Sequence, residues 1–233
     1  MNIVQTATQV NVGSSSAEVF TLSMPSVVGG NALIGSFCMY SNNNTWLWDT
    51  VTDGGNTFVI RQARAGTSSF VRAGVAVALN VTGGSRTVSF NTSGSTGTTW
   101  AVYGCEEISG VLSAAAEETW DANDQIDTSA LMCSAGPITT TNAGDLFYGC
   151  AGTSSNDATM NFASPTGWTN VYRQNDNPTY TGMDAGRWEP GSTQSNYTAQ
   201  WTHDMNANDD GCGVVVALKP VAGAGGPAAS WWW

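Results

Sequence analysis

The chain has 233 residues, a formal net charge of −11, a charged fraction of 11% and 27 glycines. Phosphate backbones and anionic lipid surfaces attract clustered cations, and no Lys or Arg occurs between Arg86 and Arg173. We therefore expect neither nucleic-acid nor membrane binding. The abundance of Gly, Ser, Thr and Asn favours strands joined by tight polar turns over helices.

The N-terminal part of the chain alternates apolar segments with turns. The segment from Ala32 to Tyr40 is almost continuously apolar, which is typical of a strand covered on both faces. A Gly-rich turn follows at residues 53–56. Strict alternation from Val75 to Val81 predicts a strand with one buried face. Paired glycines in the turn at residues 82–85 predict a β-hairpin, because glycine tolerates the positive φ of primed turns.

The middle of the chain contains the only segment with a helical pattern. Ser113 is a possible cap before three alanines, so residues 113–119 are expected to form a short connector helix. Strand patterns resume after it and end with a second continuous apolar run from Gly213 to Leu218.

The two parts of the sequence resemble each other. At an offset of 113, Leu33 matches Leu146 and Val88 matches Trp201; at an offset of 112, Cys38 matches Cys150. Turn glycines and strand ends keep the same register, which predicts an internal repeat.

The resulting fold prediction is an all-β protein made of two tandem antiparallel β-sandwiches of jelly-roll type. The alternative is one large jelly-roll sandwich. We assign residues 1–112 to the N-terminal half, 113–127 to the connector, 128–220 to the C-terminal half, and 221–233 to a flexible tail that ends in Trp231, Trp232 and Trp233.

Candidates for chemistry are few. The single histidine, His203, lies in a polar segment with no nucleophile elbow nearby and is expected at the surface. The pairs Glu106–Glu107 and Glu117–Glu118 are possible carboxylates for glycoside hydrolysis, but neighbouring strand residues point to opposite faces, and a solvated acidic face is the simpler interpretation. The five cysteines lack metal or redox spacing and are expected to be thiols. We therefore predict no enzyme activity and no cofactor.

Two segments alternate oxygen-bearing side chains in the manner of calcium loops, at residues 121–127 and 204–211. Both lack the Gly and Glu of the complete pattern, and no metal site is predicted. Trp46 and Trp48 share one face of a predicted strand, where exposed aromatic rings can stack on sugars; packing in a core or at a subunit contact is the alternative.

The turn at residues 52–58, the strand-turn-strand at 78–88, and the strand end at 105–110 resemble those of a loose group of β-sandwich proteins of tailed-phage virions. In the second half, the segments 143–146 and 214–220 continue the resemblance, which covers residues 25 to 220. The resemblance implies a structural scaffold and a setting in a particle, and it carries over no catalytic residue.

These observations predict a structural virion component, either a capsid-decorating protein or a head or tail fibre-like protein. Its partners would be other virion proteins and copies of itself, with Trp231, Trp232 and Trp233 docking on a neighbour. Residues 1–5 lack the basic and apolar regions of a signal peptide, so we expect synthesis in a host cytoplasm and a final location in the virion. A carbohydrate-binding module is the alternative function, and a glycan-directed hydrolase is a more distant one.

Overall fold

The computed structural model describes residues 1–15, 19–41, 47–64, 71–93, 99–112, 117–125, 132–153, 162–174, 181–203 and 211–221. Within these ranges every regular element is a β-strand, and every strand pairing is antiparallel. The all-β prediction is therefore confirmed. The described residues include no helix that is long and apolar enough to cross a membrane.

Eight strands come from the N-terminal half and eight from the C-terminal half. They are β1 (Asn2–Ser15), β2 (Val19–Val27), β3 (Ala32–Ser41), β4 (Leu47–Thr52), β5 (Val59–Arg64), β6 (Val71–Ala78), β7 (Gly84–Ser93), β8 (Thr99–Ser109), β9 (Glu117–Gln125), β10 (Met132–Ile138), β11 (Leu146–Thr153), β12 (Phe162–Ala163), β13 (Thr169–Gln174), β14 (Gly182–Trp188), β15 (Tyr197–His203) and β16 (Gly211–Leu218).

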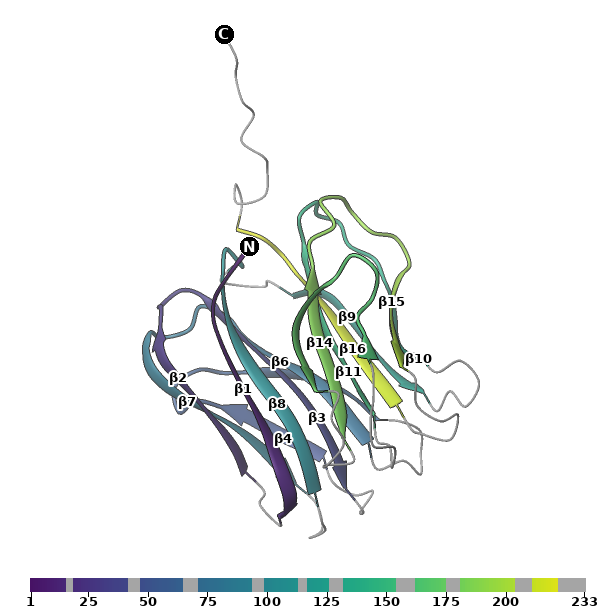
Figure 1. Cartoon of the computed structure of the whole chain (residues 1–233). Helices are drawn as coiled ribbons and strands as arrows, with labels where there is room; N and C mark the ends of the chain where they lie inside the picture. The colour runs from purple at the N-terminus through teal and green to yellow at the C-terminus, as the bar shows by residue number, and fades with distance from the viewer. Residues whose placement is uncertain are drawn as a thin grey trace.

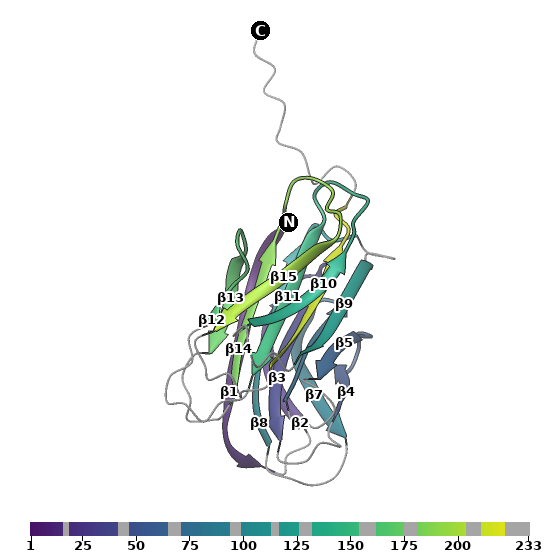
Figure 2. The ribbon, with the colours of Figure 1, turned by 90° about the vertical axis from the view of Figure 1, so that its right-hand side faces the viewer.

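The strands form four sheets stacked as layers (Figure 1). The outer sheet of the first half has the order β2-β7-β4, and its inner sheet has the order β1-β8-β3-β6-β5. The inner sheet of the second half has the order β13-β14-β11-β16-β9, and its outer sheet has the order β10-β15-β12. The two five-stranded sheets face each other in the middle. Figure 2 views the stack from the side of the second half, with β10 and β15 in front.

Each half follows the jelly-roll order. The first, eighth, third and sixth strands of a half lie in one sheet, and the second, seventh and fourth lie in the other. The fifth strand pairs with the sixth and so belongs to the inner sheet. Among the described strands, β4 and β12 are therefore each paired on one side only. Jelly-roll sandwiches are thus the correct fold class, and the two of them share a buried central layer.

The strand order is the same in both halves, as an internal repeat predicts. Leu33 and Leu146 lie on the equivalent strands β3 and β11, but Leu33 points into the core of the first half and Leu146 into the central layer. On these two strands the offset of 113 is one residue out of register, and the face is reversed because side chains alternate along a strand. On β7 and β15 the same offset keeps the face, since Val88 and Trp201 both point into the core of their own half. The even offset, which pairs Cys38 with Cys150, places both residues in the central layer.

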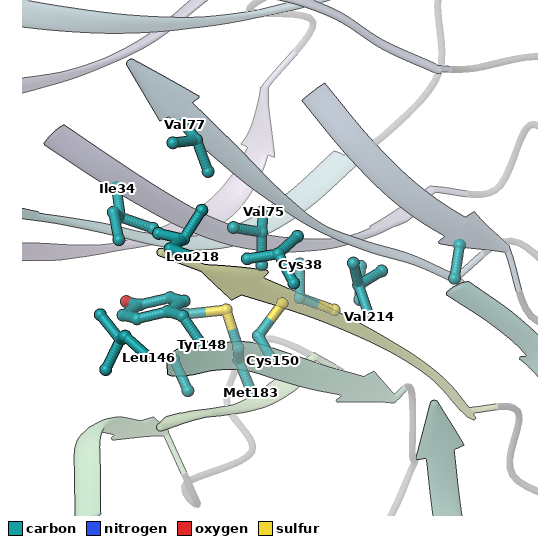
Figure 3. Close-up of a cluster of buried hydrophobic side chains, with 14 of the residues drawn as sticks. Ile34, Cys38, Val75, Val77, Leu146, Tyr148, Cys150, Met183, Val214 and Leu218 are labelled. Carbon is teal, nitrogen blue, oxygen red and sulfur yellow. The ribbon is translucent and has the colours of Figure 1, made fainter. Parts of the chain in front are cut away.

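The central layer explains the continuous apolar runs. Ile34, Cys38 and Val75 of the first half pack against Tyr148, Cys150 and Val214 of the second half (Figure 3). Because β3, β6, β11 and β16 have a core on each side, all the residues of these central strands are buried except Tyr40, which is half-buried. The expectation that only one face of the 75–81 segment is buried was therefore wrong: Ala76 and Ala78, between the valines, face the core of the first half.

Each half also has its own core between its outer and inner sheets. In the first half, Trp48 packs against Phe20, Phe37 and Phe90, with ring centroids 4.6 to 6.3 Å apart. In the second half, Trp201 packs edge-on against Trp168 at 5.5 Å. These aromatic clusters contribute dispersion and burial that fix each outer sheet on its inner sheet.

The turn at residues 82–85 is not a hairpin, because β6 and β7 belong to different sheets. Gly84 has a φ of +108°, so glycine is needed there for an arch between the two layers. The N–H of Gly30 donates a hydrogen bond of 3.0 Å to the carbonyl of Val81, and this bond fixes the arch to the turn before β3.

The expected connector helix is also wrong where it can be assessed. Residues 113–116 lie outside the described residues, but Glu117–Gln125 form β9, which pairs along β16 from Leu218 to Gly211. For residues 117–119 of the expected helix, pairing with the buried strand β16 determines the conformation. The assigned connector therefore contains the first strand of the second half.

The two halves contact each other at both ends of the molecule as well as in the central layer. At one end, Thr181 donates a hydrogen bond of 3.4 Å to the carbonyl of Trp100. At the other end, Val111 and Pro220 form a β-bridge, and the N-terminal amine lies 2.9 Å from the Glu189 carboxylate. These contacts and the central layer hold the halves together as one block.

Candidate functional site

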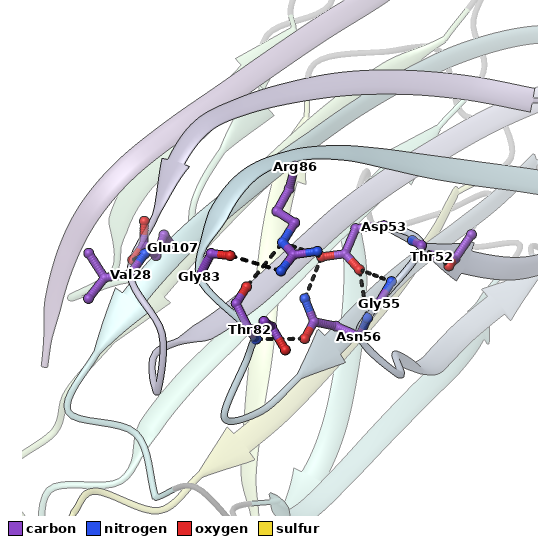
Figure 4. A network of polar contacts seen from close by, with 10 residues as sticks. Val28, Thr52, Asp53, Gly55, Asn56, Thr82, Gly83, Arg86 and Glu107 are labelled. Atoms are coloured by element: carbon purple, nitrogen blue, oxygen red, sulfur yellow. Dashed lines mark hydrogen bonds and ion pairs between the residues drawn. The ribbon is translucent and has the colours of Figure 1, made fainter.

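The turn motifs that carry the virion resemblance meet in one polar network. Asp53 Oδ1 accepts hydrogen bonds from the backbone N–H groups of Gly55 (3.0 Å) and Asn56 (2.7 Å). Asn56 Oδ1 then accepts from the N–H of Thr82 at 2.8 Å, and Arg86 donates to the carbonyl of Thr82 at 3.0 Å (Figure 4). These hydrogen bonds hold the β4–β5 turn against the β6–β7 arch, and this explains the conformation of both motifs.

Glu106 and Glu107 are both buried, which corrects the expectation of a solvated acidic face. They point to opposite sides of β8, as strand geometry requires. Glu107 accepts hydrogen bonds from Gln5 Nε2 (2.6 Å), from the N–H of Val28 (2.8 Å) and from Asn31 Nδ2. It therefore ties β1 and the turn before β3 to β8. Figure 4 shows Glu107 beside Val28 of that turn. The two carboxyl groups do not face a common space and do not form a glycosidase pair.

Glu106 faces the second half. Thr6 Oγ1 donates to Glu106 Oε1 at 3.1 Å, whereas Oε2 has no hydrogen-bond partner among the described residues. Burial raises the pKa of Glu106 to about 7, and Thr6, Arg187 and Tyr148 oppose this increase. The side chain is 1% exposed, so this titrating group is located inside the contact between the halves.

Asp184 organises a second polar cluster, on the outer-core side of β14. Its Oδ2 lies 2.6 Å from Arg173 Nε and 2.8 Å from Asn170 Nδ2, and its Oδ1 accepts from Ser164 Oγ at 2.8 Å. Burial raises the pKa of Asp184, while the hydrogen bond and charge of Arg173 lower it. This cluster fastens β13 and the turn after β12 to β14.

His203 is 8% exposed and packs against Phe162 at a ring distance of 6.0 Å, so its expected surface position was wrong. It ends β15 and pairs with Phe162 in the ladder. The sequence showed a polar segment after it and gave no sign that β12 covers it. Glu117 and Glu118 lie on β9, and no side-chain geometry is described for them.

The predicted aromatic sites have different outcomes. Trp48 is 1% exposed in the core of the first half, so it is not available to stack on a sugar, and the packing alternative is correct. Trp46 lies outside the described residues. The tail with Trp231, Trp232 and Trp233 also lies outside them, and the last described residue, Val221, donates its N–H to the carbonyl of Gly110 at 2.9 Å.

The calcium-loop patterns are not supported as loops. Residues 121–125 lie within β9, and Asp121 Oδ2 accepts the N–H of Gly136 at 2.7 Å. Residues 204–210 lie outside the described part of the chain. Among the residues that the structure does describe, no group of three or more His, Cys, Asp or Glu is placed to hold a metal ion. All five cysteines are free and buried, and burial raises the pKa of Cys133 and Cys150 to about 12.

Two shallow grooves lie where the chain leaves an outer sheet for an inner one. One, of about 450 Å³, is lined by residues 49–52, 56–58 and 60. The other, of about 380 Å³, is lined by residues 163–166 and by Tyr197, Thr198, Gln200 and Thr202. In each half the fifth strand pairs with the sixth, in the inner sheet, and not with the fourth. Sequence patterns did not predict this change of sheet.

In comparisons with known proteins, no family model, no curated protein and no solved structure matches this chain.

Proposed function

We propose that the protein is a structural component of a phage-type particle, as a capsid-decorating or head or tail fibre-like subunit. It acts without a catalytic step, through contacts with other virion proteins and with copies of itself. The proposal combines the resemblance of its turn and strand motifs to virion β-sandwich proteins with the way in which the fold uses its polar residues.

The observation that carries the proposal is that buried carboxylates connect separate strands and turns through hydrogen bonds. The Glu107 carboxylate accepts hydrogen bonds from three donors on separate elements. The Asp184 carboxylate binds Arg173, Asn170 and Ser164 in the same way. Asp53 fixes the β4–β5 turn through Gly55 and Asn56, and Asn56 joins that turn to Thr82 of the β6–β7 arch. Such use of carboxylates stiffens a scaffold. Fused jelly rolls stiffened in this way suit a subunit that works by shape, and jelly rolls build capsid domains as well as lectins.

Carbohydrate binding is the second candidate function, because the two grooves offer hydroxyl and amide groups beside aromatic residues. Tyr197 and Gln200 line one groove, and Thr57 and Phe58 line the other. Concave sites with a few polar groups and an aromatic surface are typical of small-ligand sites. Loss of glycan binding in Gln200→Ala, with glycan-array signal in the parent protein, would favour this function.

The experiment that tests the primary proposal is density-gradient fractionation of particles from a lysate in which the gene is expressed. We expect the protein to sediment with the particles. A variant that lacks residues 231–233 should show reduced occupancy with an unchanged melting temperature, because the tail is the predicted docking arm. A protein that stays entirely in the light fractions contradicts the proposal.

A further inference from the structure

The strand β1 forms one edge of the inner sheet of the first half. It pairs with β8 in an unbroken register from Gln5, opposite Glu107, to Asn11, opposite Ala101. No other strand of the described residues pairs with it, so its second side presents main-chain N–H and C=O groups at the margin of the molecule (Figures 1 and 2). An open edge of this kind is a template for another strand.

The composition of β1 is unusual for an exposed edge. Asn2–Ser15 contains no Asp, Glu, Lys, Arg or Pro, although the chain carries a net charge of −11. Natural edge strands are generally protected by charges, prolines or bulges. Here register shifts occur between Ile3 and Gln5 and between Asn11 and Ser15, and they leave the regular segment between them unprotected.

The sequence of this regular segment identifies the partner. Residues 4–10 read Val-Gln-Thr-Ala-Thr-Gln-Val, which is the same in both directions around Ala7. When two copies of a strand pair antiparallel around a two-fold axis, each residue opposes its mirror position in the sequence. Centred on Ala7, every opposing pair would join identical residue types. Thr6 would face Thr8 of the second copy, a pairing that favours cross-strand contact.

We propose that β1 is a homotypic docking edge, in which β1 of one copy pairs antiparallel with β1 of a second copy around Ala7. The inner sheets of the two copies then form one continuous sheet. Thr6 and Thr8 are exposed, so the pairing needs no rearrangement of the core. The nearest acids do not oppose it, because Glu106 and Glu107 are buried on β8, hydrogen-bonded to Thr6 and Gln5, and Glu189 is paired with the N-terminal amine. This inference goes beyond the proposed function, since such a dimer forms whether or not the protein joins a particle.

The test is sedimentation equilibrium of the full chain over a concentration series. In the proposed pair, Thr6→Lys combined with Thr8→Lys places lysine opposite lysine twice, whereas Thr6→Lys combined with Thr8→Glu places lysine opposite glutamate twice. Like charges directly across a ladder repel, so the dissociation constant of the dimer should rise about tenfold in the double-lysine variant. Opposite charges attract, so the lysine–glutamate variant should restore the dimer.

The control carries two lysines on a different edge. Thr21→Lys combined with Ser23→Lys alters exposed positions of β2, which pairs only with β7 among the described strands. Both double-lysine variants reduce the net negative charge equally, and this general effect favours association. Both β1 variants also remove the hydrogen bond from Thr6 to Glu106. A dimer that is lost in the double-lysine β1 variant, kept in the β2 control and restored in the lysine–glutamate variant therefore reports the local contact. Thermal melts establish that each variant is folded.

Three results would overturn the inference. One is a parent protein that remains monomeric at the highest concentration. Another is a double-lysine β1 variant that dimerises like the parent. A third is a monomer that dimerises only after residues 222–233 are deleted, which would assign the β1 edge to the protein's own tail. The failure of particle binding with an intact dimer would count against the proposed function and not against this contact.

Discussion

Replacement of Glu106 by glutamine changes a buried carboxyl group in the central layer into a neutral amide of nearly the same size. The native pKa of Glu106 is about 7, compared with a value of 4.5 in a solvated chain, because burial disfavours the charged form. Between these two pH values the native state retains a proton that the unfolded chain has released. Stability therefore falls as the pH rises through this window.

The structure sets the size of this effect. A carboxyl that shifts from 4.5 to about 7 contributes a pH-dependent loss of on the order of 3 kcal/mol between pH 4.5 and 7. Below pH 4.5 both states are protonated, and the loss is absent. Above pH 7 the native protein holds a carboxylate between the two inner sheets. Glu106→Gln removes this cost and should make the protein more stable than the parent at pH 8.

Urea unfolding of the parent and of Glu106→Gln at pH 5 and pH 8 measures the difference. Other titrating groups, Asp184 included, are common to both proteins and cancel in the comparison. Glu107→Gln is the matched control: Glu107 accepts hydrogen bonds from Gln5, Val28 and Asn31, so its replacement should destabilise at both pH values. If the stability difference between parent and Glu106→Gln is the same at pH 5 and pH 8, the reasoning about the central layer is refuted.

Three further predictions concern packing and docking. Gly211→Ala places a Cβ 2.5 Å from Cys133 Sγ and should lower the free energy of unfolding by about 1–3 kcal/mol in denaturant unfolding. Adding Cys133→Ala should recover stability, and a loss that is not recovered argues against this contact. Trp48→Ala should cost about 3–5 kcal/mol, because it empties the aromatic core of the first half; a loss below about 1 kcal/mol would show that Trp48 is not a core residue. Deletion of residues 231–233 should leave the unfolding midpoint unchanged while particle occupancy falls, and undiminished occupancy would remove the docking role of the tail.

The fold class could be predicted because its evidence is local. The continuous apolar runs of β3 and β16 indicate strands covered on both faces, and the structure provides a core on each side. Turn glycines with positive φ, such as Gly54 and Gly84, mark chain reversals. Whether a reversal is a hairpin or an arch depends on the sheet that the next strand joins, which a local pattern does not contain.

The buried polar groups could not be predicted for the same reason. Glu107 receives its hydrogen bonds from residues 76 to 102 positions away in the sequence. Its neighbour Glu106 lies against strands of the other half. Two adjacent acids that the sequence suggests are solvated are therefore both buried, by different parts of the fold. Residues 117–119, expected at the end of a helix, instead form the start of β9 because they pair with β16, which is distant in the sequence.

The number of copies of the protein in purified particles tests the central claim most directly. Quantitative mass spectrometry against an abundant particle protein gives this number after gradient purification. A structural subunit that docks by shape should be present in a fixed copy number that is a multiple of the symmetry of its attachment site. A trace amount that varies between preparations and is removed by washing would contradict a structural role.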